Sequence, residues 1–494
     1  LVTPRTTYHR HQDGLAHNGA SPASFPVDWR GQSVSDWSAN LYRTVSLPDA
    51  RLEKRLLTIS QTLAAKPLDT INQACENWAG AKGAYRFIEN TAVTYDALTT
   101  PVADATARAG AGRDELICAQ DTTVLSFERA RKAKGLGPVN DSPNARGMFL
   151  HPTLALRRDG APIGLLDLQR WCREPDARGA EDSDAIRSGG QKESVKWSAG
   201  VRAARRAIQA NVPEQQRPRL IHVFDREGDI HEVFDLIESA GDGAVIRCNH
   251  NRRVMTADGC GALAHDAVHA ADLLGTVVMD VPRKQGHKKR RARIEVRVCK
   301  VALNPGRQTS DRPRRFDLNL VEVIETDAPE GVEPLRWLLW TTEPVDQLDQ
   351  ALETVRIYKL RWKIEEFNLI LKSGCGIEKL QFETAERLEK VVALYAPIAV
   401  RILQMRDWSR LAPDAPCTIA LRDDQWRALW TYIHKKRPPS GTSPPTIRQA
   451  TLWLGRLGGH LGRKSDGMPG VRALWRGWRD LDLLATMFAI ADPE

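Results

Sequence analysis

Four polar side chains share one face of a segment that the apolar periodicity predicts to be a long helix, Val345 to Leu371 and just beyond it. They are Tyr358, Arg361, Glu365 and Lys372. At roughly 100° per residue, all four fall within an arc of about 60°. The opposite side is apolar, with Leu360, Ile364, Phe367 and Leu371. A phenol, a guanidinium, a carboxylate and an ammonium on one face can bind phosphates and a cation. A surface helix with an ion pair between Arg361 and Glu365 has the same spacing.

Two aspartates stand where apolar runs end. Asp121 closes the run 116–121, and Asp225 closes the run 220–225. Acids at the exits of buried strands pack poorly but are good ligands for hard cations. With Glu365 they can hold two Mg²⁺ ions about 3.5–4 Å apart, the arrangement used for in-line phosphoryl transfer. Glu227 and Asp229 compete with Asp225 for the ligand role, and strand-end acids also serve as helix caps.

The elements that position these residues alternate between strands and helices. The segments 148–156 and 162–171 flank Arg158-Asp159-Gly160, a hairpin signal. A strand is expected at 244–247, and helices are expected over 36–73, 384–411 and 418–436. This pattern predicts an α/β core. Within a β-rich region, 250–335, the stretch Arg283–Arg297 holds eight basic residues against one acid, which favours a phosphate-binding hairpin over a solvated loop.

Composition narrows the classes of protein. With 42% hydrophobic and 27% charged residues, the 494-residue chain cannot be wholly disordered. The net charge of +9 is compatible with a polyanionic partner. The eight cysteines form no CxxC pair, which argues against a zinc ribbon and indicates a reducing compartment. No apolar run reaches the roughly 18–20 residues that span a bilayer, so we expect a cytosolic protein without a membrane partner.

The spacing of the four helix residues matches a known signature. Tyr358, Arg361, Glu365 and Lys372 stand as in the YREK motif of the insertion-sequence-four family of bacterial DDE transposases, which the chain resembles. Further segments resemble that family in the same order along the chain: 83–88, 120–123, 225–227, 337–345, 456–459 and 473–478.

The resemblance implies a fold and a domain organisation. We expect an α/β protein with a ribonuclease-H-like catalytic core, flanked by an N-terminal helical DNA-binding domain and a C-terminal helical domain. Residues 1–36 are expected to be a flexible polar leader, and 37–108 the domain that binds transposon ends. The core is expected over 109–384 with its β-rich insertion at about 250–335, and the dimerisation domain over 385–494.

The resemblance also assigns roles to residues. Asp121, Asp225 and Glu365 are implied to be the catalytic, metal-binding triad, with two Mg²⁺ per active site and Mn²⁺ able to substitute. The residues implied to contact DNA are Tyr358, Arg361, Lys372, Trp337, Arg247, Trp362, Arg51, Arg55 and Arg86. Among them, Trp337 is expected to stack on a base flipped out of the terminal duplex.

The implied activity is cut-and-paste transposition by a bacterial, nucleoid-associated enzyme. Its partners are double-stranded DNA, as terminal inverted repeats and as target, and a second protomer in a homodimeric synaptic complex. The reaction is nicking, hairpin formation, hairpin resolution and joining of the 3′-OH ends to target DNA. Two alternatives remain open: a catalytically silent DNA-binding regulator, and a structure-selective nuclease of the same fold.

Overall fold

The computed structural model describes residues 34–75, 77–130, 132–139, 144–174, 192–281, 290–303, 315–463 and 466–491. These residues divide into two compact units. One comprises Arg219–Arg361, and the other comprises the described residues up to Pro218 and from Trp362 onward. The expected leader lies almost wholly outside the described residues, as does the basic segment 283–289.

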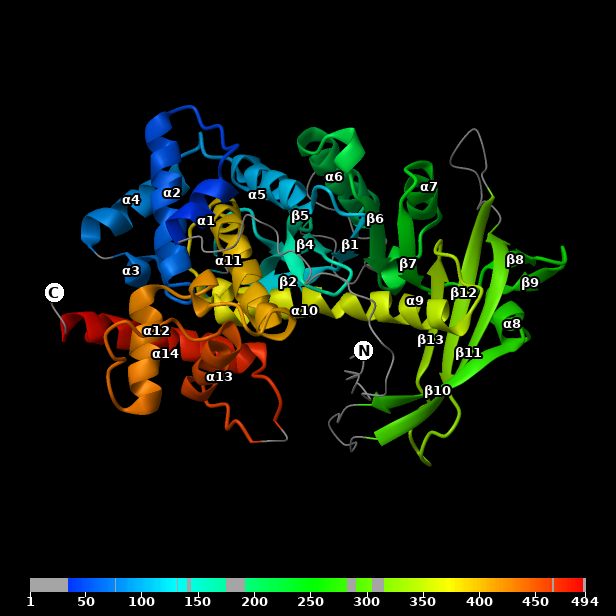
Figure 1. Cartoon of the computed structure of the whole chain (residues 1–494). Helices are drawn as coiled ribbons and strands as arrows, with labels where there is room; N and C mark the ends of the chain where they lie inside the picture. Colours follow the sequence, from blue (N-terminus) through cyan, green and yellow to red (C-terminus); the bar gives the residue numbers. More distant parts are fainter. Residues whose placement is uncertain are drawn as a thin grey trace. The chain divides into compact units, whose positions relative to one another are not determined.

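The Arg219–Arg361 unit is built on a mixed sheet with the strand order β6-β7-β13-β12-β11-β8-β9, and β10 pairs with β11. β6 and β7 run parallel, and the other pairs in this unit are antiparallel. Helix α8 packs on β11 and β12, as Figure 1 shows. The elements are β6 (Arg219–Phe224), α7 (His231–Ser239), β7 (Gly243–Arg247), β8 (Arg253–Thr256), β9 (Gly261–Leu263), α8 (Ala264–His269), β10 (Leu273–Val281), β11 (Arg290–Leu303), β12 (Phe316–Glu325), β13 (Arg336–Thr341) and α9 (Leu348–Leu360).

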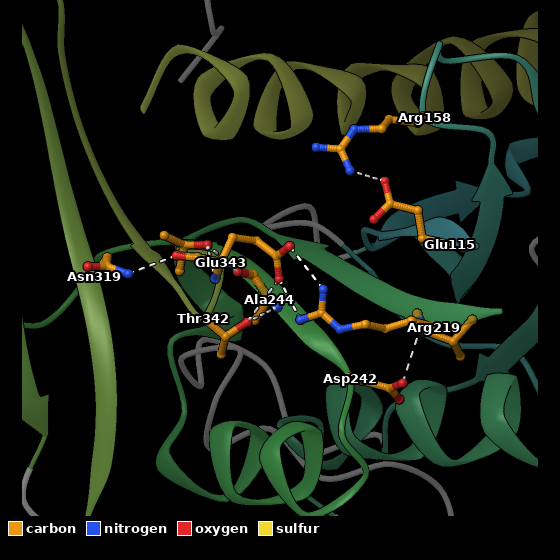
Figure 2. Close-up of polar contacts among 10 residues, drawn as sticks. Glu115, Arg158, Arg219, Asp242, Ala244, Asn319, Thr342 and Glu343 are labelled. Atoms are coloured by element: carbon orange, nitrogen blue, oxygen red, sulfur yellow. Dashed lines mark hydrogen bonds and ion pairs between the residues drawn. The ribbon is translucent and has the colours of Figure 1, made fainter. Parts of the chain in front are cut away.

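An ion pair connects β6, which precedes Asp225, with the end of β13, which carries Trp337. Arg219, at the start of β6, makes two hydrogen bonds of 2.6 and 3.0 Å to the carboxylate of Glu343, just after β13. Asn319 of β12 donates to the Glu343 carbonyl at 2.8 Å, and the Ala244 N–H donates to the Thr342 hydroxyl at 2.8 Å (Figure 2). These bonds fix β6, β7 and β13 relative to one another.

The second unit has an antiparallel sheet around the long strand β4, which pairs with β1, β2, β3 and β5. The turn between β4 and β5 contains Gly160 at a φ of 89°, a left-handed conformation that glycine adopts without strain. The hairpin predicted around Arg158-Asp159-Gly160 is therefore confirmed. The strands are β1 (Glu115–Gln120), β2 (Thr123–Ser126), β3 (Gly137–Pro138), β4 (Arg146–Leu156) and β5 (Pro162–Trp171).

Helices make up most of this unit, and polar caps begin several of them. Asp49, Asn77, Thr94, Thr384 and Thr446 each accept a hydrogen bond from the first turn of the helix that follows. The helices are α1 (Val34–Leu41), α2 (Ala50–Ala65), α3 (Ile71–Ala74), α4 (Trp78–Glu89), α5 (Tyr95–Gly110), α6 (Val195–Asn211), α10 (Trp362–Leu369), α11 (Ala385–Leu411), α12 (Asp423–His434), α13 (Ile447–Leu457) and α14 (Val471–Ile490).

Helix α11 lies at the centre of the unit and is buried on nearly all sides. It contacts β5, α5, α13 and α14, and the last two pack against each other and α12 (Figure 1). A helix that is buried all round is typical of the core of a large protein. No helix in the described part of the chain is long and apolar enough to cross a membrane.

The predicted α/β class is confirmed, with a helical N-terminal region, a central mixed sheet and a helical C-terminal domain. Two expected helices were wrong in extent. The segment 36–73 forms three helices, α1 to α3, and the helix expected over 418–436 begins at Asp423. The segment 36–73 is divided because the turns at 42–49 and 66–70 contain Pro48 and Pro67. A proline disfavours helical backbone angles in the residue before it.

Candidate active site and DNA-binding surfaces

Five predicted site residues gather in the Arg219–Arg361 unit: Asp225, Arg247, Trp337, Tyr358 and Arg361. Burial raises the pKa of the Tyr358 phenol, while the charges of Arg361 and Arg247 lower it and that of Asp225 raises it. The three charged groups are thus close enough to act on one hydroxyl. The Trp337 ring meets the Tyr358 ring edge-on, with centroids 5.5 Å apart. An acid, two guanidinium groups and two aromatic rings therefore form one cluster.

The structure separates the competing acids after β6. Asp229 is buried, with 1% of its surface exposed. Its carboxylate accepts hydrogen bonds from the Asn249 and His250 N–H groups at 2.8 and 3.0 Å and from Arg252 at 2.9 Å. Asp229 therefore anchors the loop after β7. Asp225 caps the 3₁₀ turn Arg226–Gly228 by accepting the Glu227 N–H at 3.0 Å, and Glu227 itself is exposed.

The other unit holds Asp121, Glu365 and Lys372. Asp121 follows β1 and accepts the Thr122 N–H at 2.8 Å, and α10, which carries Glu365, packs against β1. The Lys372 ammonium donates to the Val124 carbonyl of β2 at 2.7 Å. All three residues thus belong to elements at the β1–β2 part of the sheet.

Buried ion pairs hold the Glu365 helix to α11. Lys363 binds Asp407 at 2.6 Å, and Arg406 binds both Asp407, at 2.9 Å, and Glu366. Lys363 and Glu366 lie on α10, and Arg406 and Asp407 lie on α11. The two α11 side chains are almost inaccessible to solvent. Removing one partner of a buried pair is costly because the other charge stays buried. The network therefore positions the backbone that presents Glu365.

The single long helix predicted over 345–371 is wrong. Helix α9 ends at Leu360, the Arg361 N–H bonds the Tyr358 carbonyl only three residues back at 3.1 Å, and α10 begins at Trp362. A π-helical segment, Ile370–Gly374, follows. Tyr358 and Arg361 belong to one compact unit, and Glu365 and Lys372 to the other.

The three residues of the predicted triad have side chains of the chemical type that binds divalent metal ions. Asp121, Asp225 and Glu365 offer carboxylate oxygens, the ligands that Mg²⁺ and Mn²⁺ prefer. Within the described ranges, no three or more His, Cys, Asp or Glu side chains are grouped so that they could hold a metal ion. The triad draws members from both units, so its metal-binding role stays a prediction.

The predicted DNA-contact residues of the N-terminal region are exposed on two neighbouring helices. Arg51 and Arg55 lie on α2, and Arg86 lies on α4. Arg51 is held by Asp49 at 2.7 Å. The Arg55 guanidinium rests on Gly83 of α4, where an added Cβ would lie 2.6 Å from its Nη1 atom.

Trp78 on α4 was missed by sequence reasoning. It is 76% exposed, although large aromatic side chains are usually well buried. Lys82 and Arg86 follow it at i+4 and i+8 and are exposed as well. That spacing, directly after the N-cap Asn77, is the signal that could have identified it. We call Arg51, Arg55, Trp78, Lys82 and Arg86 the α2–α4 face.

A second missed feature is an apolar stripe on α14. Leu483, Met487 and Ile490 are 68%, 57% and 67% exposed and recur at i, i+4 and i+7, which places them on one side of the helix. Clustered exposed apolar side chains are more typical of interaction surfaces than singly scattered ones.

The structure bears only in part on two further predictions, the basic stretch 283–297 and Trp362. In the basic stretch, residues 290–297 belong to β11, which pairs antiparallel with β10, and residues 283–289 lie outside the described part of the chain. Arg290 pairs with Glu325 and Arg297 with Glu295, both at 2.8 Å, whereas Arg291 and Arg293 are exposed. Trp362 has a buried indole nitrogen without a hydrogen-bond partner among the described residues. The DNA contact of Trp362 stays a prediction.

Three family models match the chain in succession. A transposase DNA-binding model matches residues 34–93, a transposase DDE domain model matches 182–398, and a Tn5 transposase dimerisation domain model matches 397–490. The chain therefore carries the domains of a DNA transposase of the DDE class. Along the chain the DNA-binding match comes first, the DDE match second and the match to the Tn5 dimerisation domain last. The DDE match includes Asp225 and Glu365 but begins after Asp121. DDE transposase domains generally use divalent metal ions.

Proposed function

We propose that this protein is a cut-and-paste transposase of the insertion-sequence-four family that excises its element and joins it to target DNA. The observation that carries the proposal is the cluster of Asp225, Arg247, Trp337, Tyr358 and Arg361. It combines an acid suited to a metal, two guanidinium groups suited to phosphates and an indole suited to a base. The cluster lies in a chain with DNA-binding, DDE and dimerisation domains.

The proposed metal ligands are Asp121, Asp225 and Glu365. Two Mg²⁺ ions, or Mn²⁺ in their place, would supply activation of the attacking oxygen and charge stabilisation of the leaving oxygen. The chain's own side chains hold the DNA. Arg361 and Arg247 fix phosphates beside Tyr358, and Lys372 adds a cation at β2. The ribonuclease-H-like identity of the core and its limits at 109–384 belong to this proposal.

The proposed reaction is a series of phosphoryl transfers. Water attacks the phosphodiester at the element end, and the bond to the 3′ oxygen breaks to leave a 3′-OH. That 3′-OH attacks the opposite strand, which releases the flanking DNA and closes the end as a hairpin. Trp337 receives the base that this tight turn expels from the stack. Water reopens the hairpin, and the regenerated 3′-OH attacks a target phosphodiester. One bond to phosphorus forms and one breaks at each step.

The α2–α4 face is proposed to bind the terminal inverted repeats. Its arginines and lysine neutralise phosphates, and the Trp78 indole offers an apolar contact to sugar or base edges. Arg51 exchanges its exposed pairing with Asp49 for a phosphate at small cost, because exposed ion pairs contribute little. This activity requires the DNA of the bacterial nucleoid, so we place the protein in the cytoplasm.

The decisive test is Glu365→Gln on a duplex that carries the inverted repeat from the DNA flanking the gene. Loss of one ligand should lower cleavage in Mg²⁺ by about a thousandfold or more, because the metals supply several kcal/mol of transition-state stabilisation. Retention in a gel-shift assay should be unchanged. Glu227→Gln is the matched control and should cleave normally.

Normal cleavage by Glu365→Gln would overturn the triad. A wild-type protein that binds ends without cutting them would instead be a silent regulator. Cutting of branched duplexes without strand transfer into a plasmid would identify a structure-selective nuclease.

The α14 stripe is proposed to form the dimer contact of the synaptic complex. Met487→Asp places a charge in its middle and should raise the dimer dissociation constant at least about tenfold, since burying an unpaired charge is unfavourable. Sedimentation of protein bound to paired ends measures the effect. Ala489→Asp adds the same charge at an exposed position on a different side of α14 and should leave dimerisation intact. Equal dimerisation by the two variants would exclude the stripe.

A further inference from the structure

The buried imidazole of His151 connects the two residues that flank Asp121. His151 lies on β4 and is 0% exposed. Its Nδ1 atom lies 3.0 Å from the hydroxyl oxygen of Thr122, and its Nε2 atom lies 3.1 Å from the Oε1 atom of Gln120. One ring therefore contacts the residue on each side of a predicted metal ligand.

The partners of the ring determine which nitrogen carries the proton. The Oε1 atom of Gln120 can only accept a hydrogen bond, so Nε2 of His151 donates. In a neutral imidazole the second nitrogen is an acceptor, so Nδ1 accepts from the Thr122 hydroxyl. Each of the two hydrogen bonds thus has one donor and one acceptor.

The pairing of the strands explains why this connection falls beside Asp121. β1 ends at position 120, and β2 begins at position 123. Both strands pair with β4 in one register, which places Thr122 across from His151. Asp121 then lies across from Pro152, and proline has no N–H to donate to a ladder. The hydrogen bonds of His151 therefore hold the chain at the point between β1 and β2.

Helix α6 packs against this network. The Trp197 ring meets the His151 ring edge-on, with centroids 4.7 Å apart. Gly200 lies against the Gln120 side chain, where an added Cβ would be 2.6 Å from Oε1. Gln120 and Trp197 are buried as well. Because closely packed side chains have little room to change rotamer, the network keeps one arrangement.

Thr122 carries this constraint to the carboxylate of Asp121. Its N–H donates to the Oδ1 atom of Asp121 at 2.8 Å. Thr122 is thus bound to the imidazole through its hydroxyl and to the carboxylate through its backbone. When His151 fixes Thr122, it also restricts the orientation of the Asp121 side chain.

We propose that His151 is a positioning residue that fixes the Asp121 carboxylate for metal binding. The inference rests on the ligand role proposed above for Asp121. Groups that orient a metal ligand without touching the metal change metal affinity by about 10- to 100-fold when they are lost. His151 acts through Thr122 and Gln120, so its effect belongs at the lower end of this range.

The first test measures the Mg²⁺ concentration for half-maximal single-turnover cleavage of the element end by the full-length protein. His151→Phe keeps an aromatic ring beside Trp197 but removes both ring nitrogens. It should raise this Mg²⁺ midpoint by about tenfold, and saturating Mg²⁺ should restore most of the rate. A variant that is merely less stable has fewer active molecules, which lowers the rate at every Mg²⁺ concentration and leaves the midpoint in place.

Three further variants separate hydrogen bonding from packing. Thr122→Val removes the hydroxyl but keeps the shape of the side chain, and it should raise the Mg²⁺ midpoint as well. His151→Asn has a side-chain oxygen that can accept in place of Nδ1, so it should recover part of the shift. The matched control is Thr153→Val on β4. Thr153 is buried, its hydroxyl has no hydrogen-bond partner in the described part of the chain, and its loss should leave the midpoint unchanged.

Amide hydrogen exchange of the protein without metal and DNA tests the geometry itself. In His151→Phe the peptide that contains Thr122 should exchange faster by on the order of tenfold, because its N–H bond to Asp121 is loosened, while exchange in α11 stays as in wild type. This measurement uses no cleavage, so it tests the link from His151 to Asp121 independently of the transposase proposal.

A wild-type Mg²⁺ midpoint in Thr122→Val or in a folded His151→Phe would overturn the positioning role, as would wild-type exchange at Thr122 in a folded His151→Phe. If His151→Phe does not fold, the midpoint of Thr122→Val decides. Asp121→Asn shows whether the proposed function is at fault instead. Normal cleavage by Asp121→Asn removes Asp121 from the triad and the inference with it, whereas lost cleavage together with wild-type midpoints in the other variants refutes the inference alone.

Discussion

The two halves of the YREK motif are held by different forces. Tyr358 packs edge-on against Trp337, and the Lys359 ammonium lies 5.8 Å from the centre of the same indole ring. Glu365, by contrast, lies on a helix fixed by the buried charges of Lys363, Arg406 and Asp407. Aromatic contacts stabilise mainly by burying apolar area, whereas buried ion pairs need a close partner for each charge. Tyr358, which we assign to DNA, is held by packing, and Glu365, which we assign to metal, lies on a helix that is held by charge.

This difference has a functional meaning under the proposed reaction. A metal ligand must keep its position through every step, because catalytic constellations tolerate little displacement. A side chain that receives a flipped base has to engage and release it during one cycle. Substitutions near Glu365 and substitutions near Tyr358 should therefore impair the protein in different ways. Three substitutions test this difference.

The largest effect is expected in the charged half. Asp407→Asn removes the acid shared by Lys363 and Arg406, and it should lower the free energy of unfolding by about 3–5 kcal/mol. Denaturant unfolding measures this loss, and cleavage should fall with it because α10 loses its anchor. Glu383→Gln breaks an exposed pair with Arg387 and should change stability by less than about 0.5 kcal/mol. Equal costs for the two variants would show that the buried network does not anchor α10.

An intermediate effect is expected in the aromatic half. Trp337→Ala should leave nicking intact and weaken hairpin formation by about 1–3 kcal/mol, the contribution of one stacked base, which is about 5- to 150-fold. End-labelled duplexes on denaturing gels resolve both products. Trp337→Phe should recover part of the hairpin yield. A hairpin yield equal to wild type in Trp337→Ala would remove the base-stacking role.

The smallest effect is a pH-dependent change in stability. Burial lowers the pKa of Lys359 from 10.5 to about 8, so at pH 7 the folded protein must carry a poorly solvated charge. Lys359→Met should therefore be more stable than wild type at pH 7, by on the order of 1 kcal/mol.

The sign of the pH dependence follows from proton uptake. Between pH 8 and pH 10.5 the unfolded chain keeps the Lys359 proton that the folded protein has released. Wild-type stability should thus rise relative to Lys359→Met across this window. Thermal unfolding of both proteins from pH 7 to pH 10.5 measures the difference, and a constant gap would contradict the depressed pKa.

The elements nearest the motifs followed from local sequence. The apolar runs before Asp121 and Asp225 are strands β1 and β6, because continuous apolar segments are suited to strands buried on both faces. The break at Arg361 did not follow, since no glycine or proline marks it and the backbone at Arg361 keeps helical angles, with φ −51° and ψ −33°. Trp78 was overlooked because an indole in a helical segment is normally expected in the core.

The sequence by itself determined which chemical groups recur at the transposase spacing and which runs become strands and helices, because both depend on side chains close together along the chain. The tertiary structure decided that Asp229 anchors the loop after β7, since its partners come from that loop. The ligand role of Asp225 stays a prediction. The tertiary structure also decided which charges hold α10, because Lys363 and Glu366 meet Asp407 and Arg406 of α11 only after folding. These contacts depend on burial and hydrogen bonding between segments far apart in the sequence, which the local periodicity of the sequence does not predict.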